Sequence, residues 1–165
     1  MSLAEAAAHA DALAQAGDER ALAELRARWD DELEAAARHA DYRVRAQAYR
    51  AIAQFRFRQK LELLRRGLAD ESPAARGSAL IALEALSRRH PGDVNSFRPL
   101  LHELAARDPN AAVRRLAILC LKNGPPQRDT LQLLEGIELD EEADPELRKT
   151  ARSVARLLLR RSRTK

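Results

Sequence analysis

Apolar residues recur every three or four positions along most of this chain, which is the spacing of amphipathic α-helices. One such stripe consists of Leu22, Leu25, Trp29, Leu33, Ala36 and Ala40. Along the whole chain, the pattern predicts helices over residues 3–16, 18–39, 41–55, 59–69, 73–89, 97–107, 109–122, 127–138 and 145–161. The sequence therefore predicts an all-α protein.

Turn-forming residues lie where the predicted helices begin and end. Ser2 and Glu5 have the spacing of a capping box, and Gly17 is suited to end the helix that follows. Three further pairs place an N-cap residue before a proline, which fits the first position of a helix: Ser72-Pro73, Asp108-Pro109 and Asp144-Pro145. The Pro- and Gly-containing segments 90–92 and 123–126 predict breaks between pairs of helices.

The second helix of each pair carries a repeat that is centred on an arginine. Arg45, Arg76, Arg114 and Arg148 are separated by 31, 38 and 34 residues. An apolar residue precedes each arginine, and Ala follows it three positions later: Val44 and Ala48, Ala75 and Ala79, Val113 and Ala117, Leu147 and Ala151. Because neither helix of a pair can bury its apolar face alone, the repeat predicts helix–turn–helix units that stack on one another.

Residues 70–76 and 108–114 each place an aspartate six positions before the repeat arginine, and this turn resembles that of the HEAT repeats. The resemblance extends over about residues 28–160. It implies a right-handed α-solenoid of about four helix–turn–helix repeats, formed by residues 19–55, 59–89, 97–122 and 127–161, with residues 3–16 as a capping helix. Residues 1–165 would then form a single domain.

The resemblance also implies a structural ladder between neighbouring turns, formed by Asp70, Arg76, Asp108 and Arg114. We expect Arg76 to pair with Asp70 or Asp108, and Arg114 to pair with Asp108 or with an acid of a neighbouring repeat. The aspartate position is occupied by His39 in the first unit and by Glu142 in the last.

The composition narrows the class of protein. Of the 165 residues, 45% are hydrophobic and 33% charged, which is too apolar for a disordered chain and too charged for a membrane protein. The single cysteine, Cys120, lies in an apolar run and excludes an internal disulfide. With no signal-peptide pattern at the N-terminus, we expect a cytoplasmic protein.

No residue pattern points to catalysis, a metal or a cofactor. The four histidines have no metal-ligand spacing, and no phosphate-binding glycine motif or nucleophile–base pair is present. The acidic segment 140–144 lacks the spacing of a calcium loop. The enzymatic alternative is a HEAT-like DNA glycosylase or a lyase-like protein, for which Trp29-Asp30 is the only Trp–Asp pair. We predict that the chain is not an enzyme.

Charge is distributed unevenly along the chain. Residues 1–40 contain nine acidic and four basic residues, a net charge of −5, whereas the whole chain has a net charge of +4. Residues 43–66 carry eight basic residues among the aromatic residues Tyr49, Phe55 and Phe57. This pattern fits phosphate binding with base stacking, and equally a packed helix junction with solvated arginines. The basic tail from Arg160 is expected to fray.

The positions one, five and eight residues after each repeat arginine face away from the predicted core, on the side that lines the concave face of a HEAT array. Seven of them form the predicted partner-binding surface: Arg50, Ile81, Arg115, Leu119, Lys122, Lys149 and Arg156. The others are Ala46, Ala53, Gly77, Glu84 and Ser153. Two apolar residues among cations favour an acidic or amphipathic protein partner. The alternative is a nucleic-acid binder that uses Arg50, Arg56, Arg58, Arg115, Lys149 and Arg156.

Overall fold

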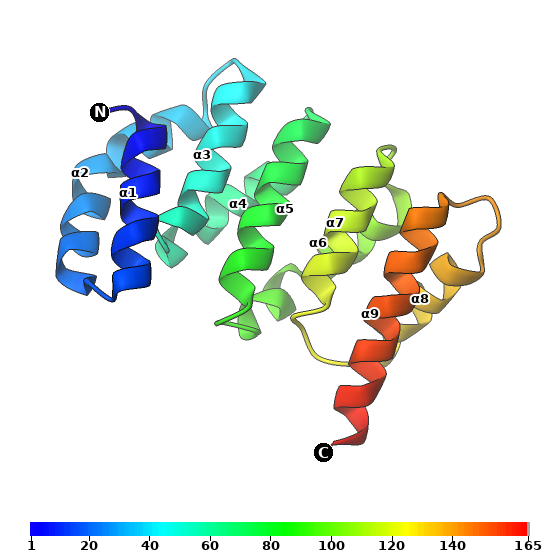
Figure 1. The fold of residues 1–165 in the computed structure, drawn as a ribbon. Helices are drawn as coiled ribbons and strands as arrows, with labels where there is room; N and C mark the ends of the chain where they lie inside the picture. The colour runs from blue at the N-terminus through cyan, green and yellow to red at the C-terminus, as the bar shows by residue number, and fades with distance from the viewer. Residues whose placement is uncertain (165) are drawn as a thin grey trace. The chain divides into compact units, whose positions relative to one another are not determined.

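The computed structural model describes residues 1–164, which contain nine α-helices, one short 3-10 helix and no strand (Figure 1). The helices are α1 (Leu3–Ala16), α2 (Glu19–Ala37), α3 (Tyr42–Gln54), η1 (Arg58–Lys60), α4 (Leu61–Leu68), α5 (Pro73–Ser87), α6 (Gly92–Arg107), α7 (Ala111–Leu121), α8 (Arg128–Leu139) and α9 (Pro145–Arg163). The all-α prediction is confirmed.

The chain divides into two compact units, Met1–Leu86 and Ser87–Lys165. In the first unit, α1 packs against α2 and α3, and α3 packs against α2 and α4. Its largest fully buried side chains include Tyr49, Phe55 and Leu64. Small alanines along α1 and α3 are buried with them, so the helices pack closely with few aromatic side chains.

The second unit consists of two helical hairpins, α6–α7 and α8–α9. The first helices of the two hairpins pack against each other, and so do the second helices α7 and α9. Val113, Ala117, Cys120 and Leu121 of α7 and Leu147, Ala151, Val154 and Leu158 of α9 are buried. These are the faces that the repeat predicted to be apolar.

Several helix ends differ from the prediction by a few residues, and three of these differences are informative. α6 begins at Gly92 rather than at residue 97, because Val94 is buried and its side chain fills the space beside Gly124. α7 begins at Ala111, with Asn110 and not Asp108 as its N-cap, because Asp108 is used to end α6. α9 continues to Arg163, so the expectation that the segment from Arg160 frays is wrong for residues 160–163.

Candidate functional site

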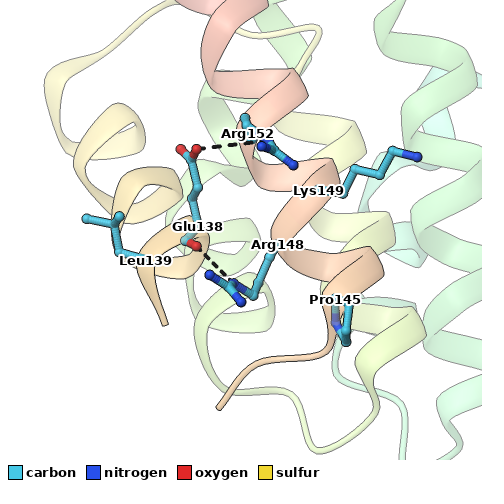
Figure 2. Close-up of a pocket in the computed structure, with 6 residues that line it drawn as sticks. All are labelled: Glu138, Leu139, Pro145, Arg148, Lys149 and Arg152. Atoms are coloured by element: carbon cyan, nitrogen blue, oxygen red, sulfur yellow. Dashed lines mark hydrogen bonds and ion pairs between the residues drawn. The ribbon is translucent and has the colours of Figure 1, made fainter. Parts of the chain in front are cut away.

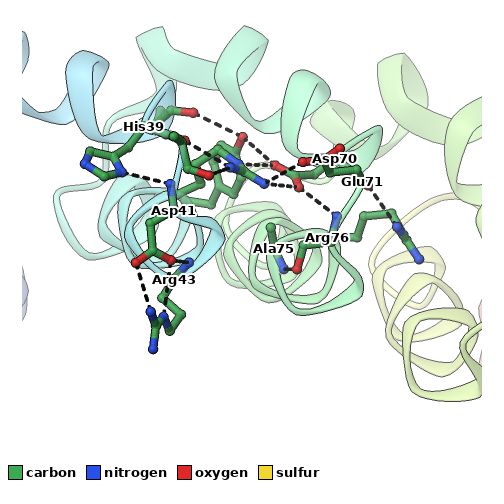
Figure 3. A network of polar contacts seen from close by, with 12 residues as sticks. His39, Asp41, Arg43, Asp70, Glu71, Ala75 and Arg76 are labelled. Atoms are coloured by element: carbon green, nitrogen blue, oxygen red, sulfur yellow. Dashed lines mark hydrogen bonds and ion pairs between the residues drawn. The ribbon is translucent and has the colours of Figure 1, made fainter.

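The turn after α4 contains the most connected carboxylate of the first unit (Figure 3). Asp70 accepts hydrogen bonds on its two carboxylate oxygens from Nε and Nη2 of Arg45, at 2.8 and 2.9 Å. The hydroxyl of Tyr49 and the backbone N–H of Ser72 also donate to this carboxylate. The Arg45 and Asp70 side chains are only 12% and 6% exposed, so this contact is a buried, bidentate ion pair.

The electrostatics of Asp70 follow from these contacts. Burial disfavours its charged form, yet the hydrogen bonds from Arg45 and Ser72 outweigh burial and lower the pKa of Asp70 below its ordinary 3.8. Burial and the negative charge of Asp70 raise the pKa of Tyr49, which therefore stays a protonated donor. The cluster holds a turn in place, and all its charges are neutralised internally.

The four repeat arginines share a contact with the end of the preceding helix. Arg45 donates to the carbonyls of His39 and Ala40, and Arg76 donates to that of Asp70. In the second unit, the guanidinium groups of Arg114 and Arg148 donate to the carbonyls of Ala105 and Glu138. Ala105 and Glu138 lie in the last turns of α6 and α8, where helix carbonyls lack an intrahelical partner, whereas His39, Ala40 and Asp70 lie in the turns just after α2 and α4.

This arrangement changes the predicted ladder. The carboxylate of Asp70 pairs with Arg45 of the preceding hairpin, while Arg76 reaches the main chain of the same residue. Arg114 meets the carbonyl of Ala105 where the sequence predicted a carboxylate. The carboxylate of Asp108 accepts the N–H of Asn110, which is the same turn contact that Asp70 makes with Ser72. A ladder that links Arg76 and Asp108 stays a prediction.

The first and last hairpins reproduce that turn contact with other residues. Nδ1 of His39 accepts the backbone N–H of Asp41 at 2.9 Å, two positions later, as an aspartate would. In the last hairpin the residue with this role is Asp140, which accepts the N–H of Glu142. The assignment of the aspartate position to Glu142 was wrong. Asp140 lies eight residues before Arg148, whereas the corresponding aspartates lie six residues before Arg76 and Arg114.

The predicted partner-binding residues are exposed to different degrees. In the first unit, Arg50 is exposed and the side chain of Ile81 is 48% exposed, whereas Ala46, Ala53 and Gly77 of the same stripe are buried. The predicted outward face is therefore narrower on α3 and α5 than the spacing suggested. The reason is that a small residue at a helix contact lets the neighbouring element approach and cover it.

In the second unit, the predicted residues of α7 and α9 lie on adjacent helices. Arg115, Lys149 and Arg156 are exposed, and Leu119 and Lys122 are half-buried. Nε of Arg115 donates to the hydroxyl of Thr150 at 3.0 Å, which fixes the arginine between the two helices. The result is an apolar side chain, Leu119, with cationic residues one helical turn before and after it.

A separate hollow of about 360 Å³ lies between α8 and the start of α9 (Figure 2). It is lined by Glu138, Leu139, Pro145, Arg148, Lys149 and Arg152. Arg148 binds the carbonyl of Glu138, and Nε of Arg152 lies 4.0 Å from the carboxylate of Glu138. Lys149 points away from Glu138. No catalytic constellation results, because the single carboxylate faces an arginine and has no nucleophile beside it.

The basic segment 43–66 forms part of a packed junction. Tyr49, Phe55 and Phe57 are buried and present no stacking surface. Arg56, which has a left-handed backbone conformation (φ 53°), donates to the carboxylate of Asp11 and to the carbonyls of Ala53 and Gln54. These observations favour the packing interpretation of the segment. Nucleic-acid binding through Arg50, Arg56 and Arg58 stays an untested prediction.

The Trp–Asp pair of the enzymatic alternative does not form an exposed site. Trp29 is buried, and its Nε1 has no hydrogen-bond partner. Asp30 and Glu34 hold Nζ of Lys60 at 2.6 and 2.7 Å. Hydrogen bonding to Lys60 lowers the pKa of Glu34, while the same two carboxylates outweigh burial and raise the pKa of Lys60. These ion pairs connect α2 to η1.

The described residues contain neither a cluster of metal-ligating side chains nor a membrane-spanning helix. Within residues 1–164, no three His, Cys, Asp or Glu side chains come together as a metal site would require. No helix in this part of the chain combines the length and hydropathy of a membrane span.

Comparison with known protein families matches residues 31–122 to HEAT repeats. Comparison with curated proteins finds no match, and neither does comparison with solved structures. The matched segment begins in α2, contains the hairpin of α4 and α5 and the turn at Asp70, and ends directly after α7. It covers more than half of the sequence and includes three of the four repeat arginines, Arg45, Arg76 and Arg114. The chain belongs to the HEAT repeat family.

Proposed function

We propose that this chain is a non-catalytic protein-interaction module that binds an acidic, amphipathic segment of a partner. HEAT repeats commonly serve as protein-interaction scaffolds and are typically non-catalytic. The observation that carries the finer proposal is the setting of Leu119, a partly exposed leucine of α7. Arg115 lies on the same helix and Lys122 is its C-cap residue, while Lys149 and Arg156 lie on the adjacent α9.

The chemistry of this surface selects the kind of partner. An amphipathic helix places apolar and acidic side chains on neighbouring faces, so one segment supplies a contact for Leu119 and counter-ions for its rim. Rim charges of this kind mainly accelerate association and exclude basic partners, whereas the apolar contact contributes more to affinity. Ile81, in the first unit, is a second exposed apolar residue on the second helix of a hairpin and is proposed to act in the same way.

The test is a titration of the full chain with a labelled synthetic helix that carries leucine and glutamate on adjacent faces. We expect fluorescence anisotropy to report micromolar binding, and a peptide with lysine in place of glutamate to bind at least tenfold more weakly. The double variant Ile81→Asp, Leu119→Asp should abolish binding. Leu139→Asp is the matched control, because Leu139 is 67% exposed and lies on α8, which contributes none of the proposed binding residues.

Thermal unfolding of each variant separates binding from folding. Leu119 is half-buried, so a carboxylate at this position lowers the free energy of unfolding if it stays partly shielded from water. If the double variant unfolds at a much lower temperature, Lys149→Glu decides the result, because this exposed residue belongs to the rim of the Leu119 surface. Equal peptide binding by the parent, Lys149→Glu and Leu139→Asp would contradict the proposal.

A further inference from the structure

We infer that the outward face of α9 is a binding surface for the phosphate backbone of duplex nucleic acid. This surface, here called the α9 stripe, consists of Arg152, Arg156, Arg160 and Arg163, all of which are exposed. Their spacing of four, four and three residues places them on one side of the helix. At 1.5 Å per residue, the stripe extends over roughly 16 Å.

The structure holds this stripe in a fixed arrangement. The opposite side of α9 is buried through Leu147, Ala151, Val154 and Leu158. Near its C-terminal end, Nη1 of Arg161 donates to the carbonyls of Lys122 and Gly124, at 2.6 and 3.1 Å. The last turn is therefore attached to the segment after α7, and the four arginines are displayed by an ordered helix.

The positive charge of the α9 stripe is largely uncompensated within the protein. Arg152 makes one long contact of 4.0 Å with Glu138, and both side chains are substantially exposed. No acidic side chain among residues 1–164 forms an ion pair with Arg156, Arg160 or Arg163. The sequence contains no acid after Glu146. Four cations in a row therefore attract a polyanion with little competition from internal acids.

The residue types of the stripe distinguish between classes of polyanion. A membrane-surface helix needs an extended exposed apolar face, but Leu159 is the one large apolar side chain of α9 that is exposed, at 40%. The main apolar face of α9 is buried in a unit where the helix packs against α7 and α8. Single-stranded nucleic acid is bound by aromatic stacking, and α9 contains no aromatic residue. Arginine contacts phosphate in a bidentate geometry, and successive cations one helical turn apart follow a line of phosphates. Duplex nucleic acid fits these features best.

This mode of binding has a defined physical signature. Contacts to phosphates alone carry no base sequence information, so affinity should be independent of sequence. Four neutralised phosphates give a slope of about −3.6 in a plot of log K against log salt concentration, because counterions are released. Affinity should then fall by about a hundredfold between about 50 and about 200 mM salt.

The test compares two variants of the full chain that carry the same total charge. The first replaces the four arginines of the α9 stripe with glutamine. The second replaces four exposed arginines of the first unit: Arg20, Arg28, Arg38 and Arg43. Each variant loses four positive charges, so its formal net charge falls from +4 to zero. Binding of a short labelled duplex of mixed sequence is measured at low and moderate salt, with circular dichroism as the check on folding.

We expect the α9 variant to lose at least tenfold in affinity and most of its salt dependence, while the first-unit variant stays within about threefold of the parent. A lysine version of the stripe should keep the salt slope but bind more weakly. Equal losses in the two glutamine variants, or no duplex binding by the parent at low salt, would overturn the inference. So would an α9 variant that loses as much affinity for polyglutamate or for phosphatidylserine vesicles as for the duplex, which would assign the stripe to a protein or a lipid surface.

The two proposals fail separately. Ile81→Asp and Leu119→Asp lie outside the α9 stripe and should leave duplex binding unchanged, whereas glutamine at Arg152, Arg160 and Arg163 should leave the binding of the acidic helix unchanged.

Discussion

At the scale of single residues, Asp70 connects two parts of the first unit. Its carboxylate neutralises Arg45, accepts a hydrogen bond from Tyr49 and closes the turn through the N–H of Ser72. Arg45 and Tyr49 belong to α3, and Ser72 belongs to the turn before α5. A single short side chain thus joins the second helix of one hairpin to the turn of the next.

Replacing this carboxylate should cost much more free energy of unfolding than replacing an exposed one. In Asp70→Asn the amide oxygen still accepts the N–H of Ser72, but Arg45 is left without its counter-charge in a buried position. We expect a loss of about 2–3 kcal/mol, measured by urea unfolding. The control is Arg43→Gln, which breaks the exposed pair between Arg43 and Asp41 and should leave the urea midpoint close to that of the parent.

The same variant should change the acid sensitivity of the protein. Because the folded state lowers the pKa of Asp70, its carboxylate stabilises the fold above the ordinary value of 3.8, and this contribution is lost as the pH falls through the lower folded-state pKa. Unfolding free energies measured across the region below that value should therefore fall less steeply with decreasing pH in Asp70→Asn. Parallel pH profiles for parent and variant would show that Asp70 is not the group involved.

At the scale of helices, α4 shows how close packing depends on a residue without a side chain. A Cβ atom on Gly67 would lie 2.7 Å from Cβ of Ala79 and 3.1 Å from the ring of Tyr49. Gly67 therefore lets α4 approach α3 and α5 at this point. Gly136 of α8 is also in a helix, yet a Cβ there meets nothing within 4 Å.

These two glycines form a matched pair for mutation. Alanine favours a helix over glycine by about 1 kcal/mol, so Gly136→Ala should stabilise the protein by about that amount. In Gly67→Ala the overlap with Ala79 outweighs this gain, and we expect a net loss of about 1–3 kcal/mol. Thermal and urea unfolding measure both changes. A stabilised Gly67→Ala variant would mean that α4 can shift away without loss of packing.

At the scale of the whole molecule, stability is expected to be local. Each of the two compact units buries its own set of apolar side chains, and repeat proteins gain stability mainly from neighbouring elements. If residues 1–165 form a single domain, as the sequence predicts, the two units should unfold together in one cooperative transition. Unfolding experiments measure this directly.

Hydrogen exchange of the two glycine variants provides that measurement. Gly67→Ala should increase amide exchange within Met1–Leu86 by about tenfold, and change exchange after Ser87 by much less. Gly136→Ala should slow exchange in the second unit only. If either substitution changes exchange equally throughout the chain, the two units unfold as one cooperative domain.

Most of the helical architecture was predictable from sequence because it depends on local periodicity. The predicted apolar stripe is buried from Leu22 to Leu33, whereas Ala36 is half-buried and Ala40 is exposed beyond the end of α2. The positions around Arg114 and Arg148 form the apolar faces of α7 and α9. The family could also be inferred, because the turn before Arg76 and Arg114 has a fixed spacing. These features require only that residues three, four and seven apart share a helix face.

The contacts that depend on three-dimensional distance were not predictable in the same way. Spacing along the sequence suggested that Arg114 meets an acid, but the end of α6 offers it a carbonyl of Ala105 instead. The same spacing placed Glu142 where the turn carboxylate was expected, but Asp140 occupies this position. The length of the loop shifts this position relative to Arg148 without changing the helices. The sequence predicted a fraying tail from Arg160, but the guanidinium group of Arg161 donates to the carbonyls of Lys122 and Gly124.

The sequence by itself thus determined which segments are helical, which of their faces are apolar and to which family they belong. The tertiary structure alone decided which charges are neutralised, at Asp70 and Lys60, and which stay available, along the outward face of α9. The physical reason is that helix formation and its apolar face are set by neighbours within a few residues, whereas a charge is satisfied by whatever the fold brings within hydrogen-bonding distance.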